Sequence, residues 1–265
     1  MRDSYAGTIY GAPMTTLLLV HGNPETDAIW DPLRAHLGDR DVEALSPPGF
    51  GAPVPEGFGA TAMEYAAWLI GVLEERGDPV DLFGHDWGGG HVIAVAMSRP
   101  DLIRSWGCDV AGILDPEYTW HDMAQVWQTP GEGEAAVTAM AETPVEQRVE
   151  AFVGLGMTPE AARSCAEAAD ADMGRCILAL YRSAAQPGLA DVGRDLEPLR
   201  ARPGLVVIPE DDPYTGGETL ARRTAERAGA DIAVLEGVGH WWMLQDPALG
   251  ATAITNFLDR LDVGG

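Results

Sequence analysis

The stretch VDLFGHDWGGG, from Val80 to Gly90, decides the fold. Its first residues, Val80-Asp81-Leu82-Phe83, indicate the central strand, and a helix continues from its last glycines to Ser98. Between them, Gly84 to Gly88 has the Gly-x-nucleophile-x-Gly form of a sharp strand-to-helix turn, with Asp86 where ester hydrolases carry serine. The alternative is a glycine-rich turn with a helix-capping aspartate. The strand before the pattern and the helix after it favour a nucleophile.

The chemistry of this turn explains its residue types. A side chain presented on such a turn needs a strained backbone, and only glycine fits where the neighbouring positions meet the adjacent strand and helix. Asp86 would also sit at the positive N-terminal end of the following helix. That end favours a negative charge, so we expect the Asp86 carboxylate to be ionised at neutral pH.

The rest of the chain alternates strand and helix patterns around this turn, which predicts an α/β fold: a mostly parallel sheet with helices on both faces. Strands are expected at 17–20, 42–45, 80–83, 103–110, 205–208 and 232–235, and helices at 61–76, 90–98, 218–228 and 247–261. Strand patterns vanish between about Ile113 and Gln186, where the chain is rich in Ala, Met, Glu and Trp. We therefore expect a core domain of 1–112 and 188–265, with a small helical cap, 113–187, inserted in it.

Composition narrows the function classes. The formal net charge is −24 and all 17 basic residues are arginine, so a Schiff-base lysine, a P-loop lysine and a lysine general base are excluded. A field this negative argues against nucleic acid and anionic membranes as partners. The three cysteines, Cys108, Cys165 and Cys176, have no metal-ligand spacing, and we expect buried free thiols. Because no apolar leader or membrane-length apolar run is visible, a cytoplasmic location is expected.

Two later loops supply partners for Asp86. Each follows a buried strand, where open α/β sheets place their ligand sites. His240, in the segment GVGHWW, is the candidate general base, and Asp212 is the carboxylate expected to orient it. The chain order of nucleophile, acid and histidine fits a hydrolase. Asp211 is a near-equal alternative to Asp212, and Asp109, after an earlier strand, is a third.

The loop after the first strand reads HGNP, from His21 to Pro24. The backbone N–H groups of Asn23 and Trp87 are candidates for an oxyanion hole, in which donors face the same developing negative charge. For His21 we favour a structural role that holds the loop in place.

The combined motifs HGNP, PPGFG, GHDWGG, the aspartate after a strand and GHWW resemble the aspartate-nucleophile branch of the α/β-hydrolase superfamily, from about Leu17 to Leu261. That branch contains haloalkane dehalogenases, fluoroacetate dehalogenases and epoxide hydrolases. The resemblance implies that Asp86 displaces a leaving group from an sp3 carbon and forms an alkyl ester, which water activated by His240 then hydrolyses. It implies no cofactor and no metal, with a small, largely apolar organic substrate and water as the partners.

The leaving group has two interpretations. Asn23 and Trp87 match the pair that holds the departing halide in haloalkane dehalogenases, which favours hydrolytic dehalogenation. Tyr181 resembles the cap tyrosine that protonates the opening ring in epoxide hydrolases, although a Tyr-Arg pair also occurs in fluoroacetate dehalogenases and the residue could simply be a packed aromatic. Epoxide hydrolases generally use a second cap tyrosine, and here Met123 stands in that region with only Tyr118 nearby. A third hypothesis is a catalytically idle fold member that binds a small molecule.

Overall fold

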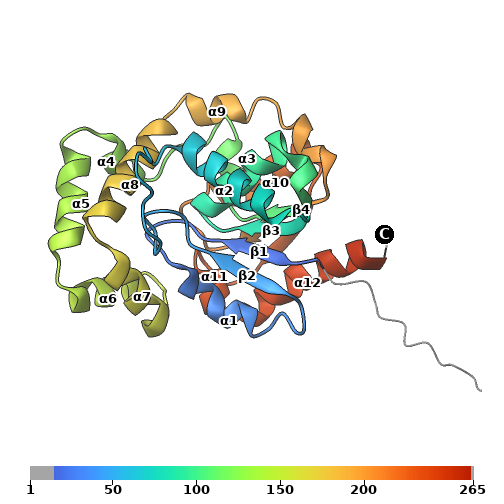
Figure 1. Cartoon of the computed structure of the whole chain (residues 1–265), viewed down its shortest axis with the longest axis horizontal. Helices are drawn as coiled ribbons and strands as arrows, with labels where there is room; N and C mark the ends of the chain where they lie inside the picture. Colours follow the sequence, from blue (N-terminus) through green and yellow to red (C-terminus); the bar gives the residue numbers. More distant parts are fainter. Residues whose placement is uncertain (1–14, 264–265) are drawn as a thin grey trace, which may run out of the picture.

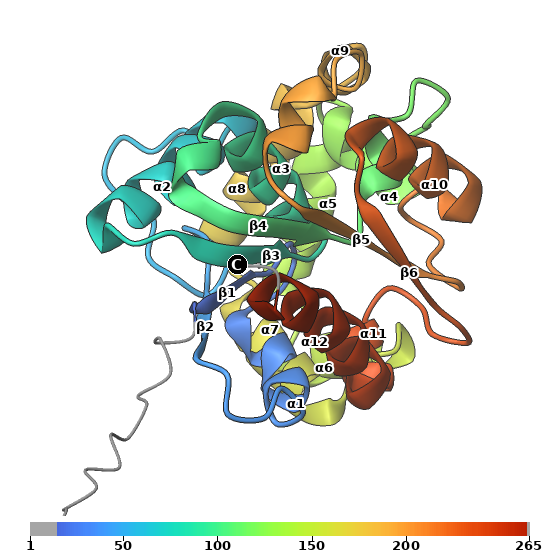
Figure 2. The ribbon, with the colours of Figure 1, turned by 90° about the vertical axis from the view of Figure 1, so that its right-hand side faces the viewer.

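The computed structural model describes residues 15–263. The N-terminal residues considered above for an export signal lie outside the described part. The core is one sheet of parallel strands in the order β2-β1-β3-β4-β5-β6 (Figure 2). The strands are β1 (Leu17–Val20), β2 (Val42–Leu45), β3 (Val80–Gly84), β4 (Ile103–Cys108), β5 (Gly204–Pro209) and β6 (Asp231–Leu235). The predicted fold class is confirmed.

Helices cover both faces of this sheet (Figure 2). On one face lie α2 (Ala62–Arg76), α3 (Trp87–Ser98) and α10 (Gly217–Ala228), and on the other lie α1 (Asp31–Arg34), α11 (Trp242–Gln245) and α12 (Pro247–Val263). The short helix α9 (Gly188–Val192) and four 3-10 turns (Asp27–Trp30, Pro100–Leu102, Ala111–Leu114 and Glu197–Ala201) lie in the connections.

The apolar strands follow from this layering. Alternate residues of β1 enter two different buried clusters: Leu18 and Val20 pack on one face of the sheet, and Leu17 and Leu19 pack on the other. A strand covered on both faces must be apolar throughout rather than at every second position. This explains why β1 reads as a continuous apolar run in the sequence.

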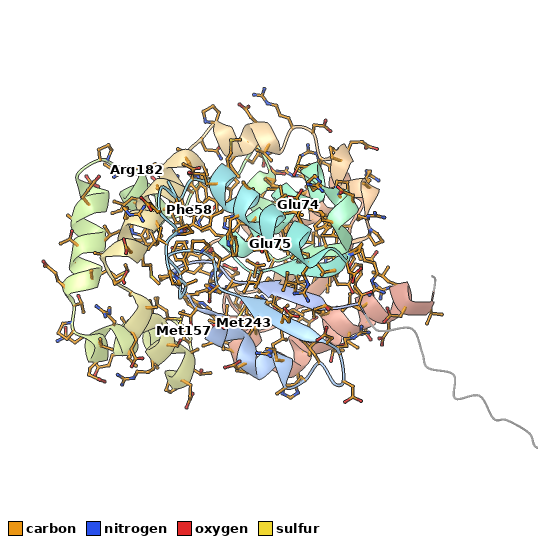
Figure 3. All side chains as sticks on the ribbon, viewed as in Figure 1. Phe58, Glu74, Glu75, Met157, Arg182 and Met243 are labelled. Carbon is orange, nitrogen blue, oxygen red and sulfur yellow. The ribbon has the colours of Figure 1, made fainter. Side chains whose placement is uncertain are left out.

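Between β4 and β5 the chain forms a separate group of helices beside the sheet (Figure 1). These are α4 (Asp122–Gln128), α5 (Glu132–Glu142), α6 (Val145–Gly154), α7 (Pro159–Ala168) and α8 (Ala171–Ser183). Residues of α4, α5 and α8 join the core on the α2–α3 side, whereas residues of α6 and α7 join the core on the α12 side. Met157, just before α7, and Met243, in α11, share that second cluster (both labelled in Figure 3).

The state of the cysteines and the apolar length of the helices can also be compared with the sequence predictions. Cys108, Cys165 and Cys176 are all buried and free, as predicted. Within residues 15–263, none of the helices has the length and apolar character needed to span a lipid bilayer.

Candidate active site

The turn that carries Asp86 joins β3 to α3 with a strained backbone. Asp86 has φ 49° and ψ −128°, and its N–H donates to Asp109 Oδ1 at 3.1 Å. A Cβ added at Gly84 would lie 2.3 Å from the carbonyl oxygen of Gly88, and one added at Gly88 would lie 2.1 Å from that of Val20. The glycines are therefore required by contact with backbone, which no rotamer change can relieve.

The Asp86 side chain faces a cavity between the sheet and the α4–α8 helices. Its Oδ2 is shielded from solvent and accepts no hydrogen bond from any described residue. Burial raises the pKa of this carboxyl to about 7, although the charge of His240 and a hydrogen bond from the backbone N–H of Trp87 lower it. This burial opposes the expectation that the end of α3 keeps Asp86 ionised at neutral pH.

His240 follows β6 and faces the same cavity as Asp86. Its Nδ1 lies 2.9 Å from Asp212 Oδ2. Burial alone would lower the pKa of His240, but the charge and hydrogen bond of Asp212, together with the charge of Asp86, make the net shift upward. Burial would raise the pKa of Asp212, but the charge and hydrogen bond of His240, together with the Tyr214 N–H and the charge of His85, make the net shift downward. With Nδ1–H bonded to Asp212, Nε2 is the nitrogen left to accept a proton from water.

Of the three candidate acids, only Asp212 contacts His240. Asp211 is exposed, and its backbone N–H donates to the carbonyl of Val238. Asp109 is buried but bonds to His85 at 2.5 Å and to the Trp242 indole at 2.7 Å. The geometry thus separates alternatives that the sequence left open.

The cavity above Asp86 has a volume of about 350 Å³ and a largely apolar lining. It is bounded by Asn23, Pro24, Asp86, His121, Met123, Trp127, Ala136, Met140, Phe152, Leu155, Tyr181, Tyr214, His240 and Trp241. A smaller recess of about 30 Å³ adjoins it beside Trp87 and Trp120. Among the described residues, no arginine lines the cavity or the recess. An anionic group on a substrate would therefore find no arginine to pair with there.

The predicted leaving-group residues meet beside Asp86. Asn23 Nδ2 donates to the Tyr181 hydroxyl at 3.3 Å. Burial and the nearby Asp86 carboxyl raise the pKa of the Tyr181 phenol well above its usual range, against weaker opposing hydrogen bonds from the side chains of Asn23 and Trp87. Tyr181 is therefore a neutral O–H donor. Its oxygen already accepts from Asn23, so its hydrogen is free to face a ligand.

The possible second cap donor is neither Met123 nor Tyr118. Met123 lies at the cavity rim with 48% of its surface exposed, and the Tyr118 hydroxyl donates to the carbonyl of Tyr214 at 2.9 Å. His121, which was not predicted from the sequence, lines both spaces. Burial lowers its pKa, and its Nδ1 accepts from the Ala124 N–H at 3.3 Å, so the neutral ring carries its proton on Nε2. The sequence signal that could have found His121 is its position directly before Asp122, at the start of helix α4.

The HGNP loop is held by polar contacts behind the cavity. His21 is fully buried, with Nδ1 2.8 Å from the Gly22 carbonyl oxygen and Nε2 3.1 Å from Ser46 Oγ, which fits a structural role. Glu25, His85 and His240 bring a carboxylate oxygen and two ring nitrogens within 4.8 Å of one another. These donor types suit a transition metal, but Glu25 and His85 already bond to each other at 3.1 Å.

Comparison with known proteins places the chain in a family. Residues 17–253 match the family model described as the alpha/beta hydrolase family. The chain is 27% identical to 2-(acetamidomethylene)succinate hydrolase of Mesorhizobium japonicum, with 92% of this chain and 87% of that protein covered.

Two solved structures show the same fold. One is a loop variant of the haloalkane dehalogenase DbeA from Bradyrhizobium elkanii (TM-score 0.73, 17% identity, 96% of this chain and 92% of that one). The other, from Pseudomonas aeruginosa, is a point mutant of a protein assigned as an epoxide hydrolase (TM-score 0.76, 19% identity, 94% and 90%). The sheet order, the strand-to-helix turn and the family match agree, and the chain belongs to the α/β hydrolase family.

Proposed function

We propose that this protein hydrolyses its substrate through a covalent alkyl ester on Asp86. A carboxylate oxygen of Asp86 attacks an sp3 carbon, and the leaving group departs with the bonding electron pair. His240 Nε2 then takes a proton from water, whose oxygen attacks the ester carbonyl carbon and releases the alcohol and the Asp86 carboxylate. The supporting observation is that Asp86 and His240 face one cavity and that His240 is hydrogen-bonded to Asp212.

The leaving group best served by this site is a halide. Asn23 Nδ2 donates one of its two hydrogens to the hydroxyl of Tyr181 and keeps the other, the Trp87 indole packs against the same tyrosine, and the Tyr181 hydroxyl is a further donor beside Asp86. A halide ion needs such donors and no proton. The apolar cavity, with no arginine in its described lining, fits a small, neutral haloalkane-type substrate. In this proposal residues 113–187 act as the cap, because α4, α5 and α6 contribute Met123, Ala136 and Phe152 to the lining.

Epoxide opening is the second candidate, and a specific observation favours it. The alkoxide formed when an epoxide ring opens has to be protonated, and the cavity holds two neutral donors, Tyr181 and His121. The first step on Asp86 is the same in both reactions. The product is a diol instead of an alcohol and a halide ion.

The decisive experiment is a single turnover in ¹⁸O-labelled water followed by mass spectrometry of the Asp86 peptide. Direct attack by Asp86 places the label in its carboxylate, since water enters at the ester carbonyl carbon. Asp86→Ala should abolish turnover, and His240→Gln should let the alkyl-enzyme accumulate as a mass adduct. Product formation with an unlabelled Asp86, or near-native turnover by Asp86→Ala, would refute the proposal. An absence of turnover on every halide and epoxide offered would favour the binding-protein hypothesis.

The Tyr181→Phe variant separates the two leaving groups. Loss of the phenol should slow epoxide opening by at least about 100-fold, as expected for removal of a general acid, and alkyl bromide hydrolysis by only about tenfold or less. The measurements are halide release and diol formation by the same preparations. A matched control is Tyr118→Phe, because the Tyr118 hydroxyl is already bonded to the backbone carbonyl of Tyr214. Equal losses on both substrates in Tyr181→Phe would contradict a proton-donor role.

A further inference from the structure

The inserted helices divide into two groups, α4–α5–α8 and α6–α7, and both groups line the cavity above Asp86 (Figure 1). Met123 and Met140 belong to the first group, and Phe152 belongs to the second. The buried apolar residues of the two groups lie in different core clusters, so no shared apolar core joins them. Leu155, directly after α6, lines the cavity with 53% of its surface exposed. The cavity therefore lies between the two groups and opens to solvent there.

One arginine connects the two groups. Arg148, in α6, donates through Nη1 to the carbonyl oxygen of Thr143 at 2.7 Å. The same nitrogen lies 3.0 Å from the carbonyl oxygen of Ala141 and 3.1 Å from that of Met140, both in the last turn of α5. Its Nε donates to the carbonyl oxygen of Ala166, near the end of α7, at 2.9 Å. Within the part of the chain that the structure describes, no other side-chain hydrogen bond or ion pair joins the two groups.

The acceptors of Arg148 explain why the residue is an arginine. The last carbonyls of a helix lack partners within it and carry its partial negative charge, so one guanidinium can serve the ends of α5 and α7 together. Other arginines of these helices act inside a single group: Arg163 pairs with Glu146 between α7 and α6. Likewise, Arg182 pairs with Glu134 between α8 and α5.

The connection lies at a corner where the angle between two helices is set. Only Thr143 and Pro144, both extended, join α5 to α6. Phe152 follows Arg148 by one helical turn on the same face of α6 and is the buried residue of that helix. The hydrogen bond from Arg148 to the backbone of Met140 therefore fixes how far Phe152 stands from Met140 across the cavity.

We propose that Arg148 is a specificity-determining residue: it fixes the angle between α5 and α6, and thereby the width of the cavity and the girth of the molecules that fit in it. It acts through Phe152 and touches no ligand itself, so its role is one of positioning. Without this connection the two helices take wider angles more often, and a bulky ligand selects those states. The limit on bound ligands stands by itself, whereas the limit on substrates that are turned over rests on the proposed function.

The test compares the binding of two neutral alcohols, slim n-hexanol and bulky adamantylmethanol, to the full-length protein. Trp127 and Trp241 line the cavity, so their fluorescence reports binding without turnover. Arg148→Met keeps an apolar stem and removes the guanidinium. In this variant the ratio of the two affinities should shift toward the bulky alcohol by at least about fivefold, as expected when charge-assisted hydrogen bonds that favour the narrow form are lost.

The matched control is Arg163→Met, which removes an arginine that acts inside the α6–α7 group and should leave the ratio unchanged. A general loosening of the fold would weaken the binding of both alcohols alike and would not move their ratio. Arg148→Gln, whose side chain is too short to reach both helix ends, should shift the ratio in the same direction and decides the matter if Arg148→Met does not fold. An unchanged ratio in the Arg148 variants, or an equal shift in Arg163→Met, would overturn the inference.

The binding experiment and the ¹⁸O experiment can fail separately. A shifted ratio with an unlabelled Asp86 would remove the alkyl ester and keep Arg148 as the residue that sets the width of the cavity. A labelled Asp86 with an unmoved ratio would do the reverse.

Discussion

The Asp86 carboxyl is held in a place that opposes its ionisation. Burial raises its pKa to about 7, and its Oδ2 has no hydrogen-bond donor among the described residues. An attacking oxygen without hydrogen bonds keeps its lone pairs available, so the same burial that disfavours the charge makes the charged form more reactive. The rate of ester formation should accordingly fall as the pH drops below about 7.

This conflict predicts a stability gain for Asp86→Asn. The folded-state pKa lies above the ordinary value of 3.8, so ionisation destabilises the fold at pH values above the folded pKa and costs nothing below the unfolded one. At pH 8 the variant should be more stable than wild type by about 2 kcal/mol, with partial exposure allowed for. Urea unfolding at pH 8 and pH 4 measures this. A gain of equal size at both pH values would show that the carboxylate charge is not its cause.

Among the single residues of the site, the sequence predicted those that belong to recognisable motifs. Asp86, Asn23 and Trp87 occupy fixed places in short patterns, and His240 and Asp212 follow strands in the expected order. Glu25, His85 and His121 were not predicted as site residues, because their roles depend on contacts between distant segments. The upward shift in the pKa of Asp86 was not predicted, since the loss of water depends on the helices that cover the carboxyl.

Among the elements, the turn from β3 to α3 is the most constrained, and its glycines can be tested individually. In Gly88→Ala the new Cβ would meet the Val20 carbonyl oxygen at 2.1 Å, and this contact with the neighbouring strand β1 cannot relax. We expect a loss of at least about 3 kcal/mol in the free energy of unfolding.

The control lies two residues along the same helix. A Cβ added at Gly90 would lie 3.6 Å from Trp87 Cε3, which is ordinary contact. Gly90→Ala should therefore stabilise the protein by about 0.5–1 kcal/mol, because alanine is the better helix former. Thermal or urea unfolding of both variants gives the comparison. Similar losses at the two positions would contradict the assignment of the constraint to Gly88.

The sequence predicted the strands and core helices closely but not the packing of the inserted helices. Strands buried on both faces leave an unbroken apolar pattern, and the helix 62–76 begins with a capping box between Thr61 and Glu64 and ends at Gly77. Helices α4–α8 carry ordinary amphipathic patterns, which fix which face is buried but not what covers it. Their division between two cores was therefore invisible in the sequence.

The whole molecule carries a net charge of −24, and many of its described arginines lie in ion pairs such as Arg76–Glu43 and Arg163–Glu146. The pairs relieve repulsion locally, but a large excess of carboxylates remains. Such an excess destabilises the compact state through self-repulsion, and dissolved ions screen it.

The melting temperature should therefore rise with salt. Between about 10 mM and about 0.5 M NaCl we expect an increase of roughly 5 °C at pH 7.5, since screening weakens net repulsion more than it weakens exposed pairs. Differential scanning fluorimetry measures it, and a repeat near the isoelectric point of about 4.3 is the control, where the salt effect should shrink or reverse. A melting temperature that falls with salt at pH 7.5 would show that the pairs dominate.

The three buried thiols make the protein its own reporter of local opening. Cys108 lies in the sheet, Cys165 in α7 and Cys176 in α8, so each marks a different element, and Cys165 lies in another core cluster than the other two. A thiol reagent can react only when the region around its target sulfur comes apart. Labelling rates resolved by peptide mass would show whether α8 and α7 detach from the core independently. Equal rates at all three cysteines would show that the whole molecule unfolds at once.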